Sequence, residues 1–225
     1  MWAVVPIKQF SVAKMRLSAI LDEAQRVQLA RAMFRDVLRA LERCDAVCGI
    51  VVVSREPDAR PIAAEFGAQY VVEQGNDLSL AVTQGGRHVM AAGGTAMLCL
   101  HGDVPLVTAG EIGELIAAQG DRRGLTLVAD RDGTGTNGLA VSPIDLMTFS
   151  YGRDSFEAHT ETARLLGVGV RTLELEGLSL DIDTSDDLRT LMAYDRDTET
   201  LEFLRSVDVV SRLPPRHNVG QAVLG

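Results

Sequence analysis

Two acidic segments of the chain have the residue types of a divalent-cation site. Asp103 lies in the turn of LCLHGDVPL, and Asp181 and Asp183 lie two residues apart in SLDIDTSDDLR. Carboxylates at i and i+2 of an extended segment point to the same side, and two like charges close together are costly without a cation between them. Such oxygens suit a hard ion such as Mg²⁺. Asp103 with one of the later acids is therefore a candidate metal site, although capping of its own turn explains Asp103 equally well.

A cationic loop follows the first apolar run. Lys8 and Lys14 are the only lysines of the chain, and both lie in VPIKQFSVAKMRL together with Arg16. A loop after a strand can bind phosphates through backbone N–H groups and cationic side chains. The segment has no glycine, which excludes a Walker loop and a dinucleotide-binding fingerprint. The alternative is that three cations only solvate a surface loop.

Two later segments have the composition of an anion-binding site. ADRDGTGTNG offers the Thr136 hydroxyl and backbone N–H groups in a glycine-rich loop, and a flexible hairpin is its plainer explanation. In SYGRDSFEAH, Gly152 and Ser155 come at the start of a helix, whose N-terminus favours anions. His159 lies one turn further on, and we expect it to be a packed or surface histidine, not an acid–base catalyst.

These residues follow elements that alternate between strand and helix. GIVVVS, for example, is almost wholly apolar, as parallel strands covered on both faces are. The alternation predicts a single-domain, open α/β sheet that is mixed but mostly parallel, with ligands at the carboxyl ends of its strands. The predicted strands are 2–7, 49–54, 68–73, the first part of 95–107 (which then runs into a polar turn), 124–130, 139–143 and 169–177. The predicted helices are 22–44, 58–67, 78–92 and 109–120, with further helices after 152 and 184.

The alternation ends well before the C-terminus. We expect a catalytic domain at 1–195 and an extension at 196–225, made of a helix and a tail. The tail, 207–225, contains Pro-Pro and little periodicity, so it wraps over the domain or a neighbouring subunit, or is partly mobile. A homodimer that uses this tail is one possible assembly.

Composition narrows the class of protein. The 225 residues include 46% hydrophobic residues and carry a net charge of -9, without the basic stripe of a nucleic-acid-binding protein. Three cysteines in apolar surroundings suggest reduced thiols, and no apolar run approaches the roughly 20 residues that span a bilayer. We therefore expect a cytoplasmic protein with no membrane or nucleic-acid partner.

The chemistry can also be narrowed by what the sequence lacks. It shows no Ser/His/Asp spacing, no CxxC pair, no HExxH motif and no glycine-rich hydride-transfer fingerprint. The remaining features are a metal site, a phosphate loop and a cradle for a small anion. They are typical of phosphoryl or nucleotidyl transfer, in which catalysis is mainly positioning and charge stabilisation.

The blocks VPIKQFSVAKMRL, LHGDVPL, ADRDGTGTNGLAVSP, FSYGRDSFEAH and LDIDTSDDL resemble the 2-phospho-L-lactate guanylyltransferases in order and spacing. The resemblance runs from about residue 2 to about residue 192. It implies a Rossmann-like fold of the nucleotide-diphospho-sugar transferase type, acting in biosynthesis of the deazaflavin coenzyme F-420. The implied reaction joins GTP to 2-phospho-L-lactate, phosphoenolpyruvate or 3-phospho-D-glycerate and releases pyrophosphate.

The resemblance also assigns roles to residues. It implies Mg²⁺ at Asp103 and Asp181, and the spacing of Asp181 and Asp183 makes Asp183 a further candidate ligand. It implies phospho-acid binding by Thr136, Gly152 and Ser155, and GTP binding by Lys14 and Arg16, with Lys8 as a further candidate. Ser79 stands in the region expected near the nucleotide, where the family often has Asn.

Two other readings of the sequence compete with this one. Molybdenum-cofactor and sugar-phosphate nucleotidyltransferases usually open with a glycine-rich loop, whereas the first glycine here is Gly49. A non-catalytic nucleotide sensor on the same sheet would not need Asp103, Asp181 and the lysine loop together.

Overall fold

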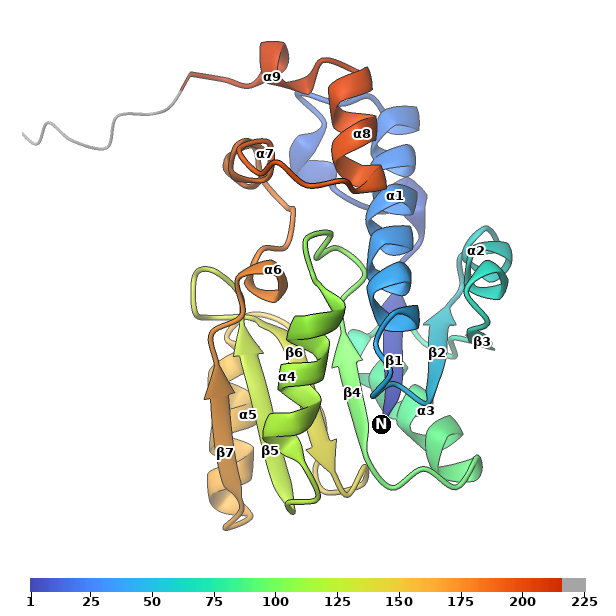
Figure 1. Cartoon of the computed structure of the whole chain (residues 1–225), viewed down its shortest axis with the longest axis vertical. Helices are drawn as coiled ribbons and strands as arrows, with labels where there is room; N and C mark the ends of the chain where they lie inside the picture. Colours follow the sequence, from blue (N-terminus) through green and yellow to red (C-terminus); the bar gives the residue numbers. More distant parts are fainter. Residues whose placement is uncertain (216–225) are drawn as a thin grey trace, which may run out of the picture.

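A mixed sheet of seven strands organises residues 1–215, which are the residues that this computed structural model describes (Figure 1). Its order is β3-β2-β1-β4-β6-β5-β7. β6 is antiparallel to β4 and β5, and the other neighbours are parallel. The mixed, mostly parallel sheet predicted from the sequence is confirmed. The strands are β1 (Trp2–Ile7), β2 (Gly49–Ser54), β3 (Gln69–Val72), β4 (Met97–Leu100), β5 (Gly124–Ala129), β6 (Thr136–Ser142) and β7 (Gly169–Leu173).

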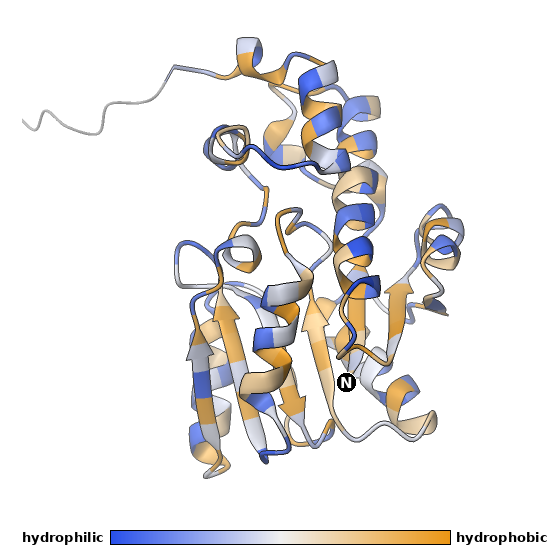
Figure 2. Cartoon of the chain, in the orientation of Figure 1, coloured by the Kyte–Doolittle hydropathy of each residue, from blue (hydrophilic) through white to orange (hydrophobic). Residues whose placement is uncertain are grey.

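Helices cover both faces of the sheet. Side chains of α1, α2 and α4 pack with Ala3 and Val5 of β1 on one face, and side chains of α3 and α5 pack with Val4 on the other. Both faces of the central strands are therefore apolar, as the orange strands of Figure 2 show. The helices are α1 (Glu23–Glu42), α2 (Ala59–Glu65), α3 (Leu78–Ala91), α4 (Ala109–Gln119), α5 (Ser155–Leu165), α6 (Glu176–Ser179), α7 (Ser185–Leu191), α8 (Glu199–Ser206) and α9 (Val209–Arg212), with 3₁₀ turns η1 (Phe10–Val12) and η2 (Met15–Leu17).

The glycines of α3 permit this close packing. A Cβ at Gly85 would lie 2.4 Å from a methyl of Val4, and one at Gly86 would lie 2.9 Å from Ile144. Two glycines in one helix lower its intrinsic stability. The contact with β1 offsets that loss, and the helix runs through both residues.

The C-terminal segment packs onto the sheet domain. A third apolar cluster joins η2, α1, α7, α8 and α9 above the sheet edge, as Figure 1 shows for the helices. The buried Asp36 of α1 accepts hydrogen bonds from the N–H groups of Glu199 and Thr200, both at 2.9 Å, and from the Thr200 hydroxyl at 2.6 Å. The residues beyond the predicted boundary at 195 thus share a core with the preceding residues, and the part of the predicted tail at 216–225 lies outside the described residues.

Several element bounds differ from those predicted. The strand expected over 95–107 covers only β4, and the one expected over 169–177 ends at Leu173. β6 begins at Thr136, inside the stretch expected to be a loop, because it pairs with Ala129 across a bulge. The segment with Asp181 and Asp183 is extended but joins no strand, and Ile182 N–H donates to Asp103 O at 3.2 Å.

No helix within residues 1–215 combines the length and the apolar character needed to cross a membrane.

Asp36→Ala is expected to loosen the contact between α1 and α8. The change leaves two backbone N–H groups and a hydroxyl without their acceptor, which should lower the free energy of unfolding by about 2 to 4 kcal/mol. Urea unfolding measures this loss. Asp36→Asn, which keeps one acceptor oxygen, should lose less. Asp58→Ala, which removes only an exposed ion pair with Arg31 at the start of α2, should change stability by under about 0.5 kcal/mol. Equal losses for Asp36→Ala and Asp58→Ala would contradict this role.

Candidate active site

Most of the predicted site residues meet in one cavity at the carboxyl ends of the parallel strands. Its volume is about 420 Å³. The segments after β1 and β4 line it, as do the start of β6 and the extended segment before α7. β6 contributes its first residues because it runs antiparallel to its neighbours. The predicted residues that line the cavity are Lys8, Lys14, Asp103, Thr136, Gly152, Ser155, Asp181 and Asp183.

Lys14 lies at the centre of this group. It stands between η1 and η2 with a left-handed backbone (φ 56°), which is uncommon for a residue other than glycine. Its Nζ lies 2.6 Å from Asp103 Oδ2 and 2.7 Å from Asp183 Oδ1, and its side chain is only 6% exposed. The lysine therefore holds together two acids that come from distant parts of the chain.

The charges of this group stabilise one another. Burial alone would lower the pKa of Lys14, but the charges of Asp103 and Asp183 outweigh that effect and raise it well above its usual value. Burial alone would raise the pKa of Asp103, yet the ammonium of Lys14 holds it below the usual range. Both groups are thus ionised at neutral pH.

Asp181 has a different environment. Burial raises its pKa to about 6, and the nearby charges of Asp103 and Asp183 act in the same direction. A hydrogen bond from Asn137 Nδ2 to Asp181 Oδ1, at 3.0 Å, opposes the shift. The sequence analysis did not single out Asn137, although its place beside Thr136 in the GTGTN block was a usable signal.

One carboxylate oxygen of this group is suited to bind a divalent cation. Asp103 Oδ1 is buried and has no hydrogen-bond partner within residues 1–215. An unpaired carboxylate oxygen is costly, and a hard cation would satisfy it. No three His, Cys, Asp or Glu side chains in the described chain form a ready-made metal group, and Lys14 binds both Asp103 and Asp183. Ligation of a cation by Asp103, Asp181 and Asp183 therefore stays a prediction, with the unpaired Asp103 oxygen as its strongest support.

Hydroxyl groups also line the cavity. Thr136 Oγ1 lies 3.3 Å from Ser155 Oγ and 3.1 Å from His159 Nδ1. Gly152 lies nearby with φ 134°, a conformation that L side chains rarely adopt. The arrangement presents small polar groups to an anion, and His159 is packed behind them, fully buried.

The glycine-rich loop beside Thr136 is held by its own acid. Asp130 accepts hydrogen bonds from the N–H groups of Thr134 and Gly135 at 2.9 and 2.8 Å. A Cβ at Gly135 would lie 2.4 Å from Asp130 Oδ2, so this close approach requires glycine. Those two N–H groups are thus occupied within the loop.

Two of the predicted nucleotide-binding residues lie outside this cavity. Arg16 is exposed at η2. Ser79 is at the start of α3, where its Oγ accepts a hydrogen bond from Tyr151 N–H at 2.9 Å. Ser79 thereby fixes the turn that carries Gly152, and its contact with a nucleotide stays a prediction.

A second cavity continues the cleft toward β2 and β3. Its volume is about 350 Å³, and it shares Lys8 and Leu78 with the first. Arg55, Glu73 and Asn76 form its polar edge. Arg55 Nη1 donates to Asn76 Oδ1 at 2.9 Å, so this edge is internally organised.

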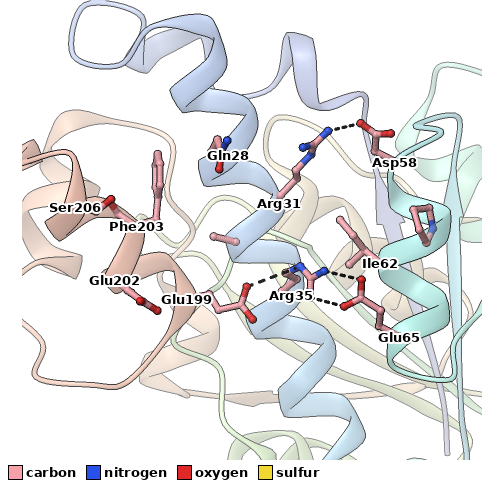
Figure 3. Close-up of a pocket in the computed structure, with 12 residues that line it drawn as sticks. Gln28, Arg31, Arg35, Asp58, Ile62, Glu65, Glu199, Glu202, Phe203 and Ser206 are labelled. Atoms are coloured by element: carbon pink, nitrogen blue, oxygen red, sulfur yellow. Dashed lines mark hydrogen bonds and ion pairs between the residues drawn. The ribbon is translucent and has the colours of Figure 1, made fainter.

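A wider cleft between α1, α2 and α8 contains none of the predicted site residues. Its volume is about 790 Å³. Figure 3 shows that Arg31 and Arg35 of α1 point toward acids of the flanking helices. Arg31 pairs with Asp58, and Arg35 pairs with Glu65 at 2.6 Å. Its charges are compensated internally, which gives no reason to place an ionic substrate there.

Comparison with known proteins identifies the family. The family model described as "Guanylyl transferase CofC like" matches residues 1–219. The chain belongs to this family. This CofC-like guanylyltransferase is 37% identical over 194 residues to the phosphoenolpyruvate guanylyltransferase of Conexibacter woesei, covering 84% of this chain and 86% of the relative. It is 31% identical over 208 residues to the 2-phospho-L-lactate guanylyltransferase of Methanothermobacter thermautotrophicus, covering 91% and 90% of the two chains.

Solved structures place the CofC-like chain among the nucleotidyltransferases by fold. A structure from Desulfovibrio desulfuricans G20, with a provisional name as a nucleotide-diphospho-sugar transferase, has a TM-score of 0.75 at 17% identity and covers 93% of this chain and 96% of its own. The family and fold inferred from the sequence blocks are therefore confirmed.

Asp181→Asn is expected to stabilise the metal-free protein at high pH. A folded-state pKa of about 6 means that the folded state holds a proton that the unfolded state has released, so wild-type stability falls as pH rises between about 4 and 6 and stays lower above. Asparagine removes this penalty and keeps an acceptor for Asn137. Urea unfolding should show a gain of about 1 to 2 kcal/mol at pH 8, allowing for partial exposure, and little gain at pH 4.

The exposed acid Asp145 provides the control, since Asp145→Asn should leave stability nearly unchanged at both pH values. An Asp181→Asn effect of the same size at pH 4 and pH 8 would show that the charge of Asp181 is not the cause.

Proposed function

We propose that this guanylyltransferase transfers GMP from GTP to phosphoenolpyruvate and releases pyrophosphate, as a Mg²⁺-dependent step in coenzyme F-420 biosynthesis. The observation that carries the proposal is the group of Lys14, Asp103 and Asp183 in a cavity that is also lined by Thr136 and Ser155. The charged group suits a triphosphate with a cation, and the hydroxyl pair suits a small anion.

The proposed reaction is one in-line displacement. An oxygen of the phospho-acid's phosphate bonds to the α-phosphorus of GTP, while the bond from that phosphorus to the bridging oxygen of the β-phosphate breaks. Pyrophosphate leaves with the electron pair of the broken bond. The attacking phosphate is already anionic at neutral pH, so the chain needs no general base. The absence of an assigned catalytic histidine agrees with this scheme.

The chain's own groups supply charge and orientation. Lys14 is a fixed ammonium beside Asp103, so it can stabilise phosphate charge while keeping that acid ionised. Lys8 lines both cavities of the cleft and is a second cation for the triphosphate. The cavity with Arg55 and Asn76 is the place we assign to the nucleoside end of GTP, because its polar edge can pair with a base.

Asp103 and Asp181 would hold the divalent cation. Bound there, the cation would neutralise phosphate charge and align the attacking and leaving oxygens. The unpaired Oδ1 of Asp103 and the raised pKa of Asp181 both support this assignment, since a cation would satisfy the first and lower the second.

The choice of acid rests on the relatives. The Conexibacter relative, named a phosphoenolpyruvate guanylyltransferase, is more similar in sequence than the Methanothermobacter relative named for 2-phospho-L-lactate. The two acids differ only in whether the bond between their second and third carbons is double or single, and a pocket distinguishes such groups by small changes of shape. Thr136 and Ser155 can bind a carboxylate or a phosphate of either acid.

The decisive assay offers the protein GTP, Mg²⁺ and equal amounts of phosphoenolpyruvate, 2-phospho-L-lactate and 3-phospho-D-glycerate. We expect pyrophosphate release only when an acid is present, loss of release with a chelator, and a mass matching the diphosphate formed from GMP and phosphoenolpyruvate as the main product. Asp103→Asn, which keeps the shape and removes the charge, should reduce the rate by about 10²- to 10³-fold.

A different acid in the main product would replace phosphoenolpyruvate as the substrate. No turnover with any of the three acids, or full activity in the chelator, would contradict the proposed reaction or its cation requirement respectively.

A further inference from the structure

His159 forms two hydrogen bonds that fix its protonation. The backbone N–H of Ser150 donates to its Nε2 at 3.1 Å. A backbone N–H can only donate, so Nε2 carries no hydrogen, and the ring is a neutral imidazole with its proton on Nδ1. Burial lowers the pKa of His159 to about 4, and the nearby His101 acts in the same direction, which is consistent with a neutral ring.

The hydrogen on Nδ1 determines the direction of the next bond. Nδ1 lies 3.1 Å from Thr136 Oγ1, so His159 donates and Thr136 accepts. Thr136 and Ser155, 3.3 Å apart, have two hydroxyl hydrogens between them, and their mutual bond uses one. The other hydrogen is left for the cavity that both residues line. With the proton on Nε2 instead, Thr136 would donate to His159, and no hydrogen would remain if Ser155 kept its bond to Thr136.

The ring is also held in place by packing and by its loop. His159 is fully buried, and the ring of Tyr151 meets it edge to face at a centroid distance of 4.9 Å. Its bond to Ser150 ties α5 to the turn that carries Gly152, and Tyr151 N–H bonds to Ser79 on the other side of that turn. One histidine thus connects the hydroxyl pair with the glycine turn.

We propose that His159 is a positioning residue for the phospho-acid: by donating from Nδ1 to Thr136, it commits one hydroxyl hydrogen of the Thr136–Ser155 pair to the anionic acid. This rests on the proposed function, in which that pair binds the acid. His159 touches neither substrate nor cation, and it acts by setting the direction of other groups' hydrogen bonds. The acid's oxygens are acceptors only, so a donor at this point favours binding and an acceptor opposes it.

The first test measures the tautomer directly. Long-range ¹H–¹⁵N spectra of the protein with ¹⁵N-labelled histidine should show one ring, lost in His159→Asn, with its proton on Nδ1 at pH 7. A proton on Nε2, or a doubly protonated ring at pH 7, would overturn the proposal. This measurement requires no turnover, so it stands even if the proposed reaction fails.

The second test uses two variants, each of which keeps one of the two hydrogen bonds of the His159 ring. In His159→Asn, the side-chain amide can take the place of Nδ1 and still donate to Thr136. In His159→Gln, the amide reaches the place of Nε2 and can accept from Ser150, but Thr136 loses its donor. We expect the KM for the acid to rise about 10- to 100-fold in His159→Gln and by under about 5-fold in His159→Asn, with the KM for GTP within about 2-fold in both.

The control is His88→Asn, since His88 of α3 pairs with Gln69 of β3 outside the cavity, and the kinetics of this variant should match wild type. Equal changes in the KM for GTP and in the KM for the acid would mean that His159 only supports the fold. A smaller rise of the KM for the acid in His159→Gln than in His159→Asn would mean that His159 does not donate to Thr136. Both results would overturn the proposal. Absence of turnover in the wild type would instead count against the proposed function alone.

Discussion

The active site depends on one buried ammonium group. Lys14 Nζ pairs with Asp103 and Asp183, so a single side chain connects the loop after β1, the turn after β4 and the segment before α7. Without that cation the two acids would repel each other. The same ammonium group can also bind a triphosphate. Lys14 would therefore both hold the acids in place and take part in the proposed reaction.

The rest of the fold holds these three segments in place. Parallel strands bring the first two to the same edge of the sheet, and Ile182 N–H bonds to Asp103 O to fix the third. Ile182 is fully buried in the apolar cluster that includes α8 and α9. The C-terminal helices therefore stabilise the acid segment although they lie away from the cleft. Asp181 lowers the stability of this region, because its ionised carboxylate is less stable in this site than in water, as its raised pKa indicates.

The sequence predicted the sheet and most of the site because both follow local rules. Apolar runs and helical spacing identify elements, and residues that follow parallel strands share one edge. Other features depend on contacts that no local pattern encodes. Lys14 lies 89 positions before Asp103 and 169 positions before Asp183, so no local pattern predicts that it pairs with them. The sequence showed only that Lys14 is one of two lysines in the chain. The burial of His159 and the placement of Arg16 outside the cavity likewise follow from packing, not from spacing.

Urea unfolding of Lys14→Met measures how strongly Lys14 holds Asp103 and Asp183 together. Lys8→Met is the matched control, because Lys8 is exposed and forms no ion pair within residues 1–215. We expect Lys14→Met to lose about 1 to 3 kcal/mol of unfolding free energy at pH 8 without metal, less than for a fully buried pair, and Mg²⁺ to restore more stability to it than to wild type. Lys14→Met as stable as Lys8→Met, with the same response to Mg²⁺, would contradict this role of Lys14.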